Sequence, residues 1–228
     1  MKTDLHIHSI HSGHAYGTLG EIVREAVEKD MDVIGISDHG PAMEGSATKV
    51  HFFMGPRIPN FDVEVLWGCE ANVLNGEGET DLPQEREEDL DYAALALHLG
   101  CGYEDRGKEG NTKALLRAMD NPNIKFISHP ANQHFPVDLV QVLEGAIERN
   151  IWLEINLSYL RHGDENRILE MIDLGKSLGG TFVVNSDAHF VQEIGDDQIL
   201  EDVGLDLDEL NVVNNDITPS NALEKLSR

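Results

Sequence analysis

Short apolar runs rich in β-branched residues recur along the chain and are separated by polar stretches. Each run has the length and composition of a strand buried in a sheet. The runs cover about residues 2–8, 32–37, 63–70, 92–98, 124–129, 151–157 and 181–187. The pattern therefore predicts about seven strands distributed over the whole sequence.

Helical patterns lie between several of these runs. The clearest begins at Thr18, where Glu21 completes a capping box; its apolar face contains Leu19, Ile22, Val23, Ala26 and Val27. A second stripe contains Leu139, Val140, Leu143, Ala146 and Ile147. A third helix is expected from about Asp164 to Leu178, before the breaker Gly179-Gly180, and a last short one is expected to start at Thr218-Pro219.

Strands that alternate with helices pair in parallel, because a tight hairpin cannot connect parallel neighbours. With about seven such units, a closed or nearly closed βα barrel is favoured over an open doubly wound sheet. Residues 40–60 and 76–88 are expected to be long loops within the barrel. The strand pattern resumes after each loop, so we expect one α/β domain over residues 1–228.

Composition limits the classes of partner. The chain has 42 acidic residues against 17 lysines and arginines, a formal charge of -25, so its field repels nucleic acid. The acidity either attracts cations to a site or only solvates the surface. No apolar run is long enough for a membrane span, and the first residues do not resemble a signal peptide, so we expect a cytoplasmic protein. A homo-oligomer stays open.

Cysteine is scarce. Cys69 and Cys101 are the two cysteines, and they form no CxxC pair. Neither a disulfide framework nor a zinc finger is indicated, and we expect both to be buried thiols.

Histidine and acidic residues stand at the ends of nearly all the predicted strands. His6 and His8 are two apart, so on an extended chain both can face the barrel mouth while Leu5 and Ile7 pack outward. The other strand ends carry Ser37-Asp38-His39, Gly68-Cys69-Glu70, Ala96-Leu97-His98, Ile127-Ser128-His129-Pro130 and Ser186-Asp187-Ala188-His189, and His14 follows the first strand.

The carboxyl ends of parallel barrel strands open on one face, where the catalytic groups of such barrels lie. Seven histidines and two carboxylates therefore converge, and burying them without metal would leave polar groups that hydrogen bonds hardly satisfy. Imidazole and carboxylate without thiolate favour zinc, with manganese or iron as alternatives, over calcium or magnesium. Nine ligands exceed the needs of one or two ions and divide naturally among three divalent ions, with one bridging carboxylate.

In order, these residues resemble the PHP family, named for polymerase and histidinol phosphatase, and especially its YcdX-like phosphatase branch. The resemblance covers residues 2 to about 220. The matching motifs are Asp4-Leu5-His6-Ile7-His8-Ser9, His14-Ala15-Tyr16, Ser37-Asp38-His39-Gly40-Pro41, Gly68-Cys69-Glu70-Ala71-Asn72, His98, Ile127-Ser128-His129-Pro130 and Ser186-Asp187-Ala188-His189.

The resemblance implies a distorted seven-stranded (βα)7 TIM-like barrel with a trinuclear centre. By analogy, one ion is assigned to His6, His8, Glu70 and Asp187, a second to Glu70, His98 and His129, and a third to His14, His39 and His189. Glu70 then bridges two ions, and Glu70, Asp187 and His189 are predicted to be catalytic. Arg57 resembles the family's phosphate-contacting arginine, with its spacing shifted by one; the alternative is a solvated loop cation.

The predicted activity is hydrolysis of small phosphomonoesters by a hydroxide formed from metal-coordinated water. Two alternatives remain: an amidohydrolase-type hydrolase, whose barrels also start with HxH, and a non-catalytic metal-binding or regulatory PHP module. Asp4 and Asp38 either orient imidazoles or anchor strand termini. Asn156 and Ser158 are either donors to the ligands or strand-end caps.

Overall fold

The computed structural model describes residues 1–83, 90–132, 134–163 and 165–226. All seven predicted strands are present and form one parallel sheet in chain order. The strands are β1 Thr3–Ile7, β2 Val33–Ile36, β3 Glu64–Asn72, β4 Tyr92–Ala96, β5 Ile124–Ile127, β6 Trp152–Asn156 and β7 Phe182–Asn185. The predicted α/β barrel of seven strands is confirmed.

The sheet closes where the chain leaves β7 and meets β1 again. Ile7 and Ala188 form a parallel bridge, and the backbone N–H of His8 donates to Ala188 O at 2.9 Å. The bridge is short, so the barrel is nearly rather than fully closed. It places the residues after β7 directly beside the end of β1.

The barrel interior contains one apolar cluster to which every strand contributes. Its strand members are Leu5, Val33, Leu66, Tyr92, Ala94, Phe126, Trp152 and Val183. The expectation that Leu5 packs outward with Ile7 is wrong, since only Ile7 joins the outer cluster under the first helix. The reason is an irregular register between Asp4 and Ile7, which offsets the alternation of side chains along β1.

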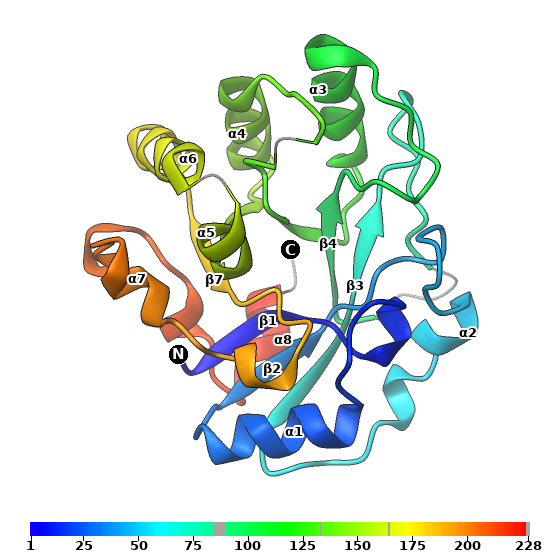
Figure 1. Ribbon diagram of the computed structural model, residues 1–228, viewed down its shortest axis with the longest axis vertical. Coiled ribbons are helices and arrows are strands. Elements are labelled where there is room, and N and C mark those ends of the chain that lie inside the picture. The colour runs from blue at the N-terminus through cyan, green and yellow to red at the C-terminus, as the bar shows by residue number, and fades with distance from the viewer. Residues whose placement is uncertain (84–89, 133, 164, 227–228) are drawn as a thin grey trace.

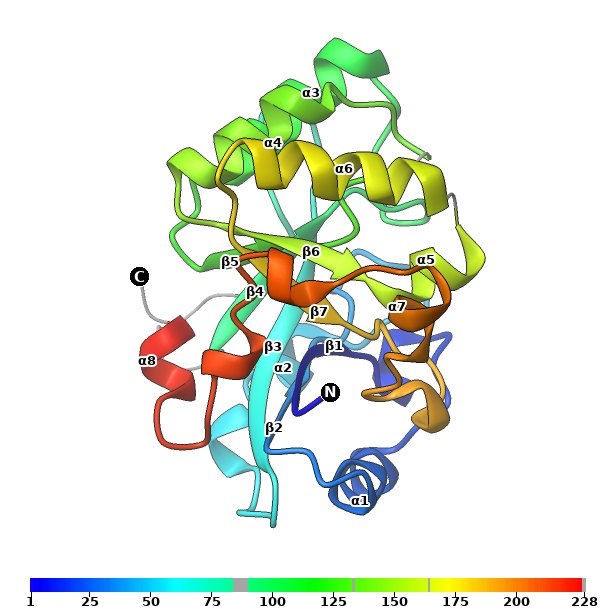
Figure 2. The ribbon, with the colours of Figure 1, turned by 90° about the vertical axis from the view of Figure 1, so that its left-hand side faces the viewer.

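Helices cover the barrel on two sides (Figures 1 and 2). α3, α4 and α6 lie side by side over one side, and α1 lies on the opposite side. The helices are α1 Leu19–Glu28, α2 Lys49–Phe52, α3 Gly107–Ala118, α4 Leu139–Glu148, α5 Leu157–His162, α6 Glu165–Ser177, α7 Gln198–Asp202 and α8 Ala222–Leu226. Short 3-10 turns include η1 Ile10–Ser12 and η2 Gly55–Arg57.

The helix predictions hold in position and differ in detail. The capping box of Thr18 and Glu21 is present at α1. On α4 the buried stripe includes Val142, whereas the predicted Val140 is 41% exposed. α8 begins at Ala222 rather than Thr218, because the backbone N–H of Thr218 donates to the side chain of Asn221 in a preceding turn.

Other differences concern elements that the apolar pattern did not signal. α3, α5 and α7 were not predicted; α3 has a polar sequence that buries Asn111 and Thr112. The expected loop at residues 40–60 contains α2 and η2, and Phe52 is fully buried there against Cys69 and Ala71. Residues 84–88 of the second expected loop, and Asp164 at the predicted start of α6, lie outside the described residues.

The expectations for the cysteines and for membrane-spanning helices can be compared with the described part of the chain. Cys69 and Cys101 are free, buried thiols, as predicted. Within the described ranges, no helix has both the length and the apolarity that crossing a bilayer requires.

Candidate metal centre

The nine predicted ligands meet at the carboxyl ends of the strands. They come from β1 and the loop after it, from β3, and from the segments that follow β2, β4, β5 and β7: His6, His8, His14, Glu70, His39, His98, His129, Asp187 and His189. His6 and Glu70 are fully buried, while His14 is exposed and His189 has 24% of its side chain exposed. The site is therefore deep at Glu70 and open toward solvent at His14 and His189.

Glu70 is the hub of this group. Its two oxygens lie within 3.5 Å of five imidazoles: His39 at 2.8 Å, His129 at 3.0 Å, His6 and His98 at 3.4 Å, and His8 at 3.5 Å. Neither oxygen has a partner in hydrogen-bonding geometry among the described residues. A buried carboxylate without hydrogen bonds is costly, so Glu70 has the character of a group that binds cations.

Asp187 faces the same space from the closing segment of the barrel. Its Oδ1 lies 3.1 Å from His8 Nε2 and 3.5 Å from His6 Nε2. Asp187 has φ 53° and His129 has φ 31°, both in the left-handed region that non-glycine residues seldom adopt. The fold thus accepts backbone strain at two of the strand exits that carry potential ligands.

Hydrogen bonds fix the tautomers of His6 and His8. His6 Nδ1 lies 2.7 Å from Glu154 Oε1, so it carries the proton and donates it. Ser12 donates its hydroxyl to Asp38 at 2.6 Å and must therefore accept from His8 Nδ1 at 2.8 Å. When both rings are neutral, their Nε2 lone pairs face each other across only 3.0 Å.

The same arrangement occurs at His98. The amide nitrogen of Asn72 donates to Asp81, so its oxygen accepts from His98 Nδ1 at 2.7 Å. His98 Nε2 consequently presents a lone pair, at 3.1 Å from His129 Nε2. His189 Nδ1 donates to the carbonyl oxygen of Asp187 at 3.0 Å, which directs a fourth Nε2 lone pair away from the backbone.

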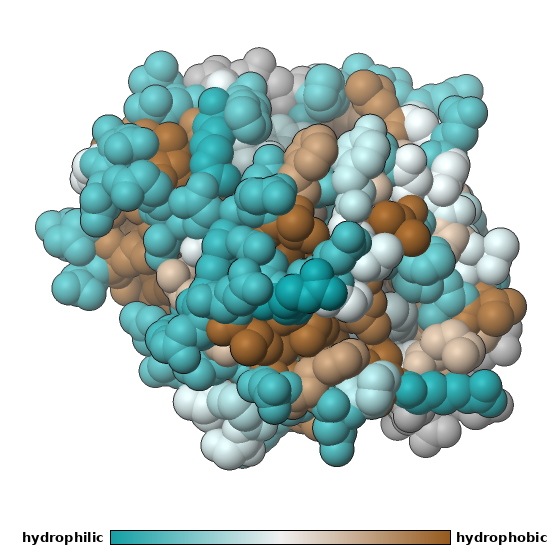
Figure 3. All heavy atoms as spheres, turned by 60° about the horizontal axis from the view of Figure 1, so that its bottom comes forward, coloured by the Kyte–Doolittle hydropathy of each residue, from teal (hydrophilic) through white to brown (hydrophobic). Residues whose placement is uncertain are grey.

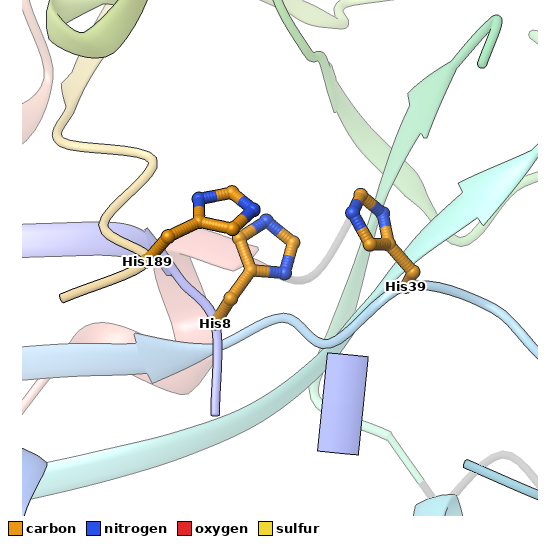
Figure 4. A group of neighbouring side chains, drawn as sticks. All are labelled: His8, His39 and His189. Atoms are coloured by element: carbon orange, nitrogen blue, oxygen red, sulfur yellow. The ribbon is translucent and has the colours of Figure 1, made fainter. Parts of the chain in front are cut away.

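This donor set fits divalent metal ions. Two nitrogens bound tetrahedrally to one zinc at 2.0–2.1 Å lie about 3.4 Å apart, close to the spacings between these facing atoms. Figure 4 shows the rings of His8, His39 and His189 pointing into one space from three different segments. Facing lone pairs repel unless a cation or a proton lies between them, and a metal ion satisfies several pairs at once.

The charges inside the site support the same fit. Burial alone would raise the pKa of Glu70, but the surrounding imidazoles, His98 and His6 foremost, hold it well below its usual range. Burial lowers the pKa of His8 and, more strongly, that of His39, which favours their neutral, metal-binding forms. For His6 and His129 burial acts in the same direction, but the neighbouring carboxylates, Glu154 and Glu70 foremost, outweigh it and raise the pKa of both rings. Without metal, the site therefore combines ionised carboxylates with both charged and neutral imidazoles.

Three groups of donor atoms can be compared with the ion sets inferred by analogy. Each group has its donor atoms within 4.8 Å of one another: His6 with His8 and Asp187, His39 with Glu70 and His98, and His8 with His39 and His189. The first group falls within the set assigned to the first ion. The other two mix the assigned sets, because His39 lies between Glu70 and His14. How the ligands divide among ions stays a prediction.

Glu154 is a member of this site that the sequence prediction missed. It is fully buried on β6 and accepts from His6 Nδ1, from the backbone N–H of His129, and from Asn156 and Asn185. A glutamate inside the apolar run 151–157 was the available signal, since it shares a face with Asn156. Glu154 therefore orients two potential ligands, His6 and His129, by accepting hydrogen bonds from them.

Asp38 and Asp4, each with two alternative predicted roles, have different roles in the structure. Asp38 acts through Ser12 on His8 and also accepts from His51 Nε2 at 2.9 Å, so it orients imidazoles. Asp4 accepts backbone N–H groups of His6, Ser186 and Gly195 and thus anchors strand ends.

Asn156 fills both of the roles considered for it. Its amide nitrogen donates to Asp187 Oδ2 at 3.1 Å, and its oxygen caps α5 by accepting from the backbone N–H of Tyr159. Arg57 lies apart from this network. It is exposed on η2, and lines a cavity that includes none of the nine residues. Its predicted contact with substrate phosphate stays a prediction.

Together, the fold and the site define a parallel βα barrel with a histidine- and carboxylate-rich centre at its mouth. The sequence profile of the PHP domain matches residues 4–158. The protein belongs to the PHP domain family.

Two relatives match most of the chain. A protein of Clostridium acetobutylicum named a probable phosphatase is 39% identical over 197 residues, covering 84% of this chain and 80% of the relative. One of Vibrio vulnificus with the same description is 39% identical over 217 residues, covering 90% and 86%.

The fold also resembles a solved structure. Histidinol phosphate phosphatase from Lactococcus lactis, crystallised with zinc, L-histidinol and phosphate, superposes with a TM-score of 0.60 at 15% identity. The match covers 89% of this chain and 91% of that one. At this identity the likeness supports the fold alone.

Proposed function

We propose that this protein is a metal-dependent phosphatase that hydrolyses small phosphomonoesters, with three divalent cations, zinc first among them, held by the nine residues at the barrel mouth. Family membership and the names of the relatives support the phosphatase activity. The zinc in the Lactococcus lactis structure and the nitrogen- and oxygen-rich donor set here support zinc.

One observation carries the proposal: acceptor oxygens take the Nδ1 proton of several imidazoles, which directs the Nε2 lone pairs of these rings toward Glu70. Glu154, Ser12 and Asn72 hold His6, His8 and His98 in this way. Metal-binding histidines typically donate their second nitrogen to such partners. A histidine cluster that served only to stabilise the barrel would also offer a hydrogen-bond donor to the second, unprotonated nitrogen of each ring.

Residues at different depths in the site have different proposed roles. Glu70 spans the centre, with Oε1 near His129 and Oε2 near His39, and this supports a bridging role between two cations. Asp187 and His189 belong to the closing segment and lie nearer the opening. When bound, the cations would lower the pKa of a coordinated water and neutralise the charge of a phosphoryl group. Substrate would enter from the exposed side, at His14 and His189.

The test combines metal analysis with an activity assay. Protein purified without added ions should contain divalent metal and hydrolyse p-nitrophenyl phosphate; chelation should abolish hydrolysis, and zinc or manganese should restore it. Glu70→Gln keeps the size of the side chain and should lower both metal content and turnover by more than tenfold. Glu144→Gln, on the exposed face of α4, is the matched control and should change neither.

The same preparation separates the rival functions. Hydrolysis of amides or lactones in place of phosphate esters would favour an amidohydrolase. Bound metal without turnover on a panel of phosphomonoesters would favour a non-catalytic module. Wild-type turnover in Glu70→Gln would refute the bridging role.

A further inference from the structure

A cavity lies on the outer side of the barrel, between the start of α1, η1, the segment from α2 to η2, the end of β2 and the middle of β3. Its volume is about 610 Å³, which is within the range of about 300–1,000 Å³ typical of small-molecule sites. Ile36 and Trp67 in its wall belong to the outer core cluster under α1. None of the nine potential ligands lines the cavity, so it is distinct from the metal centre, although Ser9 and His51 in its wall hydrogen-bond to Asp38, which also orients His8 through Ser12.

The rim of this cavity is unusually apolar. Three side chains that line it are among the exposed large hydrophobic residues of the protein: Ile10 at 48%, Val50 at 65% and Met54 at 40%. Figure 3, turned so that the α1 side comes forward, shows apolar side chains between hydrophilic ones on this face. Exposed apolar surface of this kind, gathered around a hollow, favours a ligand with an apolar body.

The polar groups of the cavity are basic or neutral. The ring centroids of His11 and His51 lie 4.3 Å apart, and Asp38 accepts a hydrogen bond from His51 Nε2. Arg57 is exposed, and within the described chain its side chain has no ion pair or hydrogen bond. No aspartate or glutamate lines the cavity, although the chain contains 42 acidic residues. With Arg57 as the charged side chain of the lining and no carboxylate among the lining residues, the cavity favours an anion over a cation.

We infer that this cavity binds a small organic anion, with its apolar body against Trp67 and Ile36 and its anionic group at Arg57. Arginine suits carboxylate and phosphoryl groups because its planar donors match two oxygens. The inference goes beyond the proposed phosphatase activity and does not depend on it. It also gives Arg57 a ligand without placing it on the metal centre.

Trp67 provides a direct reporter of binding. The chain has two tryptophans, so Trp152→Phe leaves Trp67 as the single tryptophan, which can be excited selectively above the absorption of tyrosine. Benzenesulfonate is a suitable probe, because it is not a phosphate ester and coordinates metal ions weakly. In the metal-loaded Trp152→Phe protein, it should change Trp67 emission saturably. Inorganic sulfate, which lacks the apolar body, and benzyl alcohol, which lacks the charge, should each bind at least tenfold more weakly.

Variants of this background locate the site. Arg57→Gln should weaken benzenesulfonate binding at least tenfold, whereas Arg24→Gln, on α1 and outside the cavity lining, should leave it unchanged. Thr48→Phe should weaken binding by narrowing the cavity, and Thr48 makes no side-chain cap whose loss would confuse the result. Unfolding curves check that each variant is folded.

Two results would overturn the inference: no saturable signal up to the solubility of benzenesulfonate, or equal affinity in Arg57→Gln and Arg24→Gln. Failure here would leave the phosphatase proposal intact, since the readout does not involve turnover. Displacement of benzenesulfonate by benzoate or by phenylphosphonate then shows which source of anion, a carboxylate or a phosphoryl compound, the site prefers.

Discussion

Replacing Glu154 by glutamine tests how far the potential ligands depend on the residue behind them. Oε1 of Glu154 accepts from His6 Nδ1 at 2.7 Å and from Asn185 Nδ2 at 2.9 Å. Oε2 accepts from the His129 backbone N–H at 2.7 Å and from Asn156 Nδ2 at 2.9 Å. A glutamine amide has only one oxygen, so its NH2 group must face two donors at either position.

The size of the effect follows from these contacts. Two hydrogen bonds to a charged acceptor, at about 1.5–3 kcal/mol each, give a local cost of about 3–6 kcal/mol before relaxation. Removing a buried charge offsets part of this cost. If His6 relieves the conflict by moving its proton to Nε2, it loses the lone pair that faces Glu70. Loss of such a partner typically lowers metal affinity by about 10–100-fold, or about 1.4–2.8 kcal/mol.

The assay is competition for zinc against a chromophoric chelator, together with turnover of p-nitrophenyl phosphate at limiting and at excess zinc. Glu154→Gln should bind zinc 10–100-fold more weakly and regain part of its turnover when zinc is in excess. A purely structural role would lower stability without this recovery. Zinc affinity equal to that of the wild type in a folded Glu154→Gln protein would refute the reasoning.

Three further predictions concern packing, thiols and metal. A Cβ at Gly35 would lie 2.1 Å from Tyr92 Oη inside the barrel, so Gly35→Ala should lower the free energy of unfolding by about 1–3 kcal/mol. A Cβ at Gly20 on α1 would meet no neighbouring side chain or loop within 4 Å, so Gly20→Ala should raise the free energy of unfolding by about 0.4–1 kcal/mol. Urea unfolding measures both changes. Burial raises the pKa of the Cys69 and Cys101 thiols, so iodoacetamide near pH 8 should modify neither until the protein is unfolded, as mass spectrometry would show; rapid modification of native protein would contradict their burial. Chelation should lower the midpoint of thermal unfolding, because ions that bind only the folded protein stabilise it by about 2.7 kcal/mol at a concentration 100 times the Kd; an unchanged midpoint would mean that the facing imidazoles need no metal.

The sequence was sufficient for the strands and for the clustering of the nine residues, because both depend on local pattern. Buried strands are apolar, and parallel strands end on one face, so motifs such as Ser37-Asp38-His39 could be placed without coordinates. The register irregularity in β1 could not be predicted, since it depends on pairing with the neighbouring strands. It reverses the side on which Leu5 packs while leaving His6 and His8 at the mouth.

The supporting residues were harder to predict because they lie far from their partners in sequence. Glu154 and His6 are 148 residues apart, and no local pattern joins them. Ser12 looks like an ordinary loop serine until the fold places it between His8 and Asp38. Helix α3 was missed for a related reason: its buried Asn111 is satisfied by Asp105 just before the helix and by the carbonyl oxygen of Pro136 in the loop before α4, and the second contact is supplied only by the tertiary structure.

Closure of the barrel and assembly of the metal centre depend on the same contacts. β1 and the segment after β7 are joined by the Ile7–Ala188 bridge and by few other backbone hydrogen bonds. His6 and His8 flank one side of this bridge, and Asp187 and His189 flank the other. An ion bound by His6, His8 and Asp187 would cross-link the first and last strands at the point where the hydrogen bonding between them is sparsest. Metal should therefore slow hydrogen exchange most at the backbone amides of residues 6–8 and 186–189, and much less at β4 and β5 on the far side of the sheet.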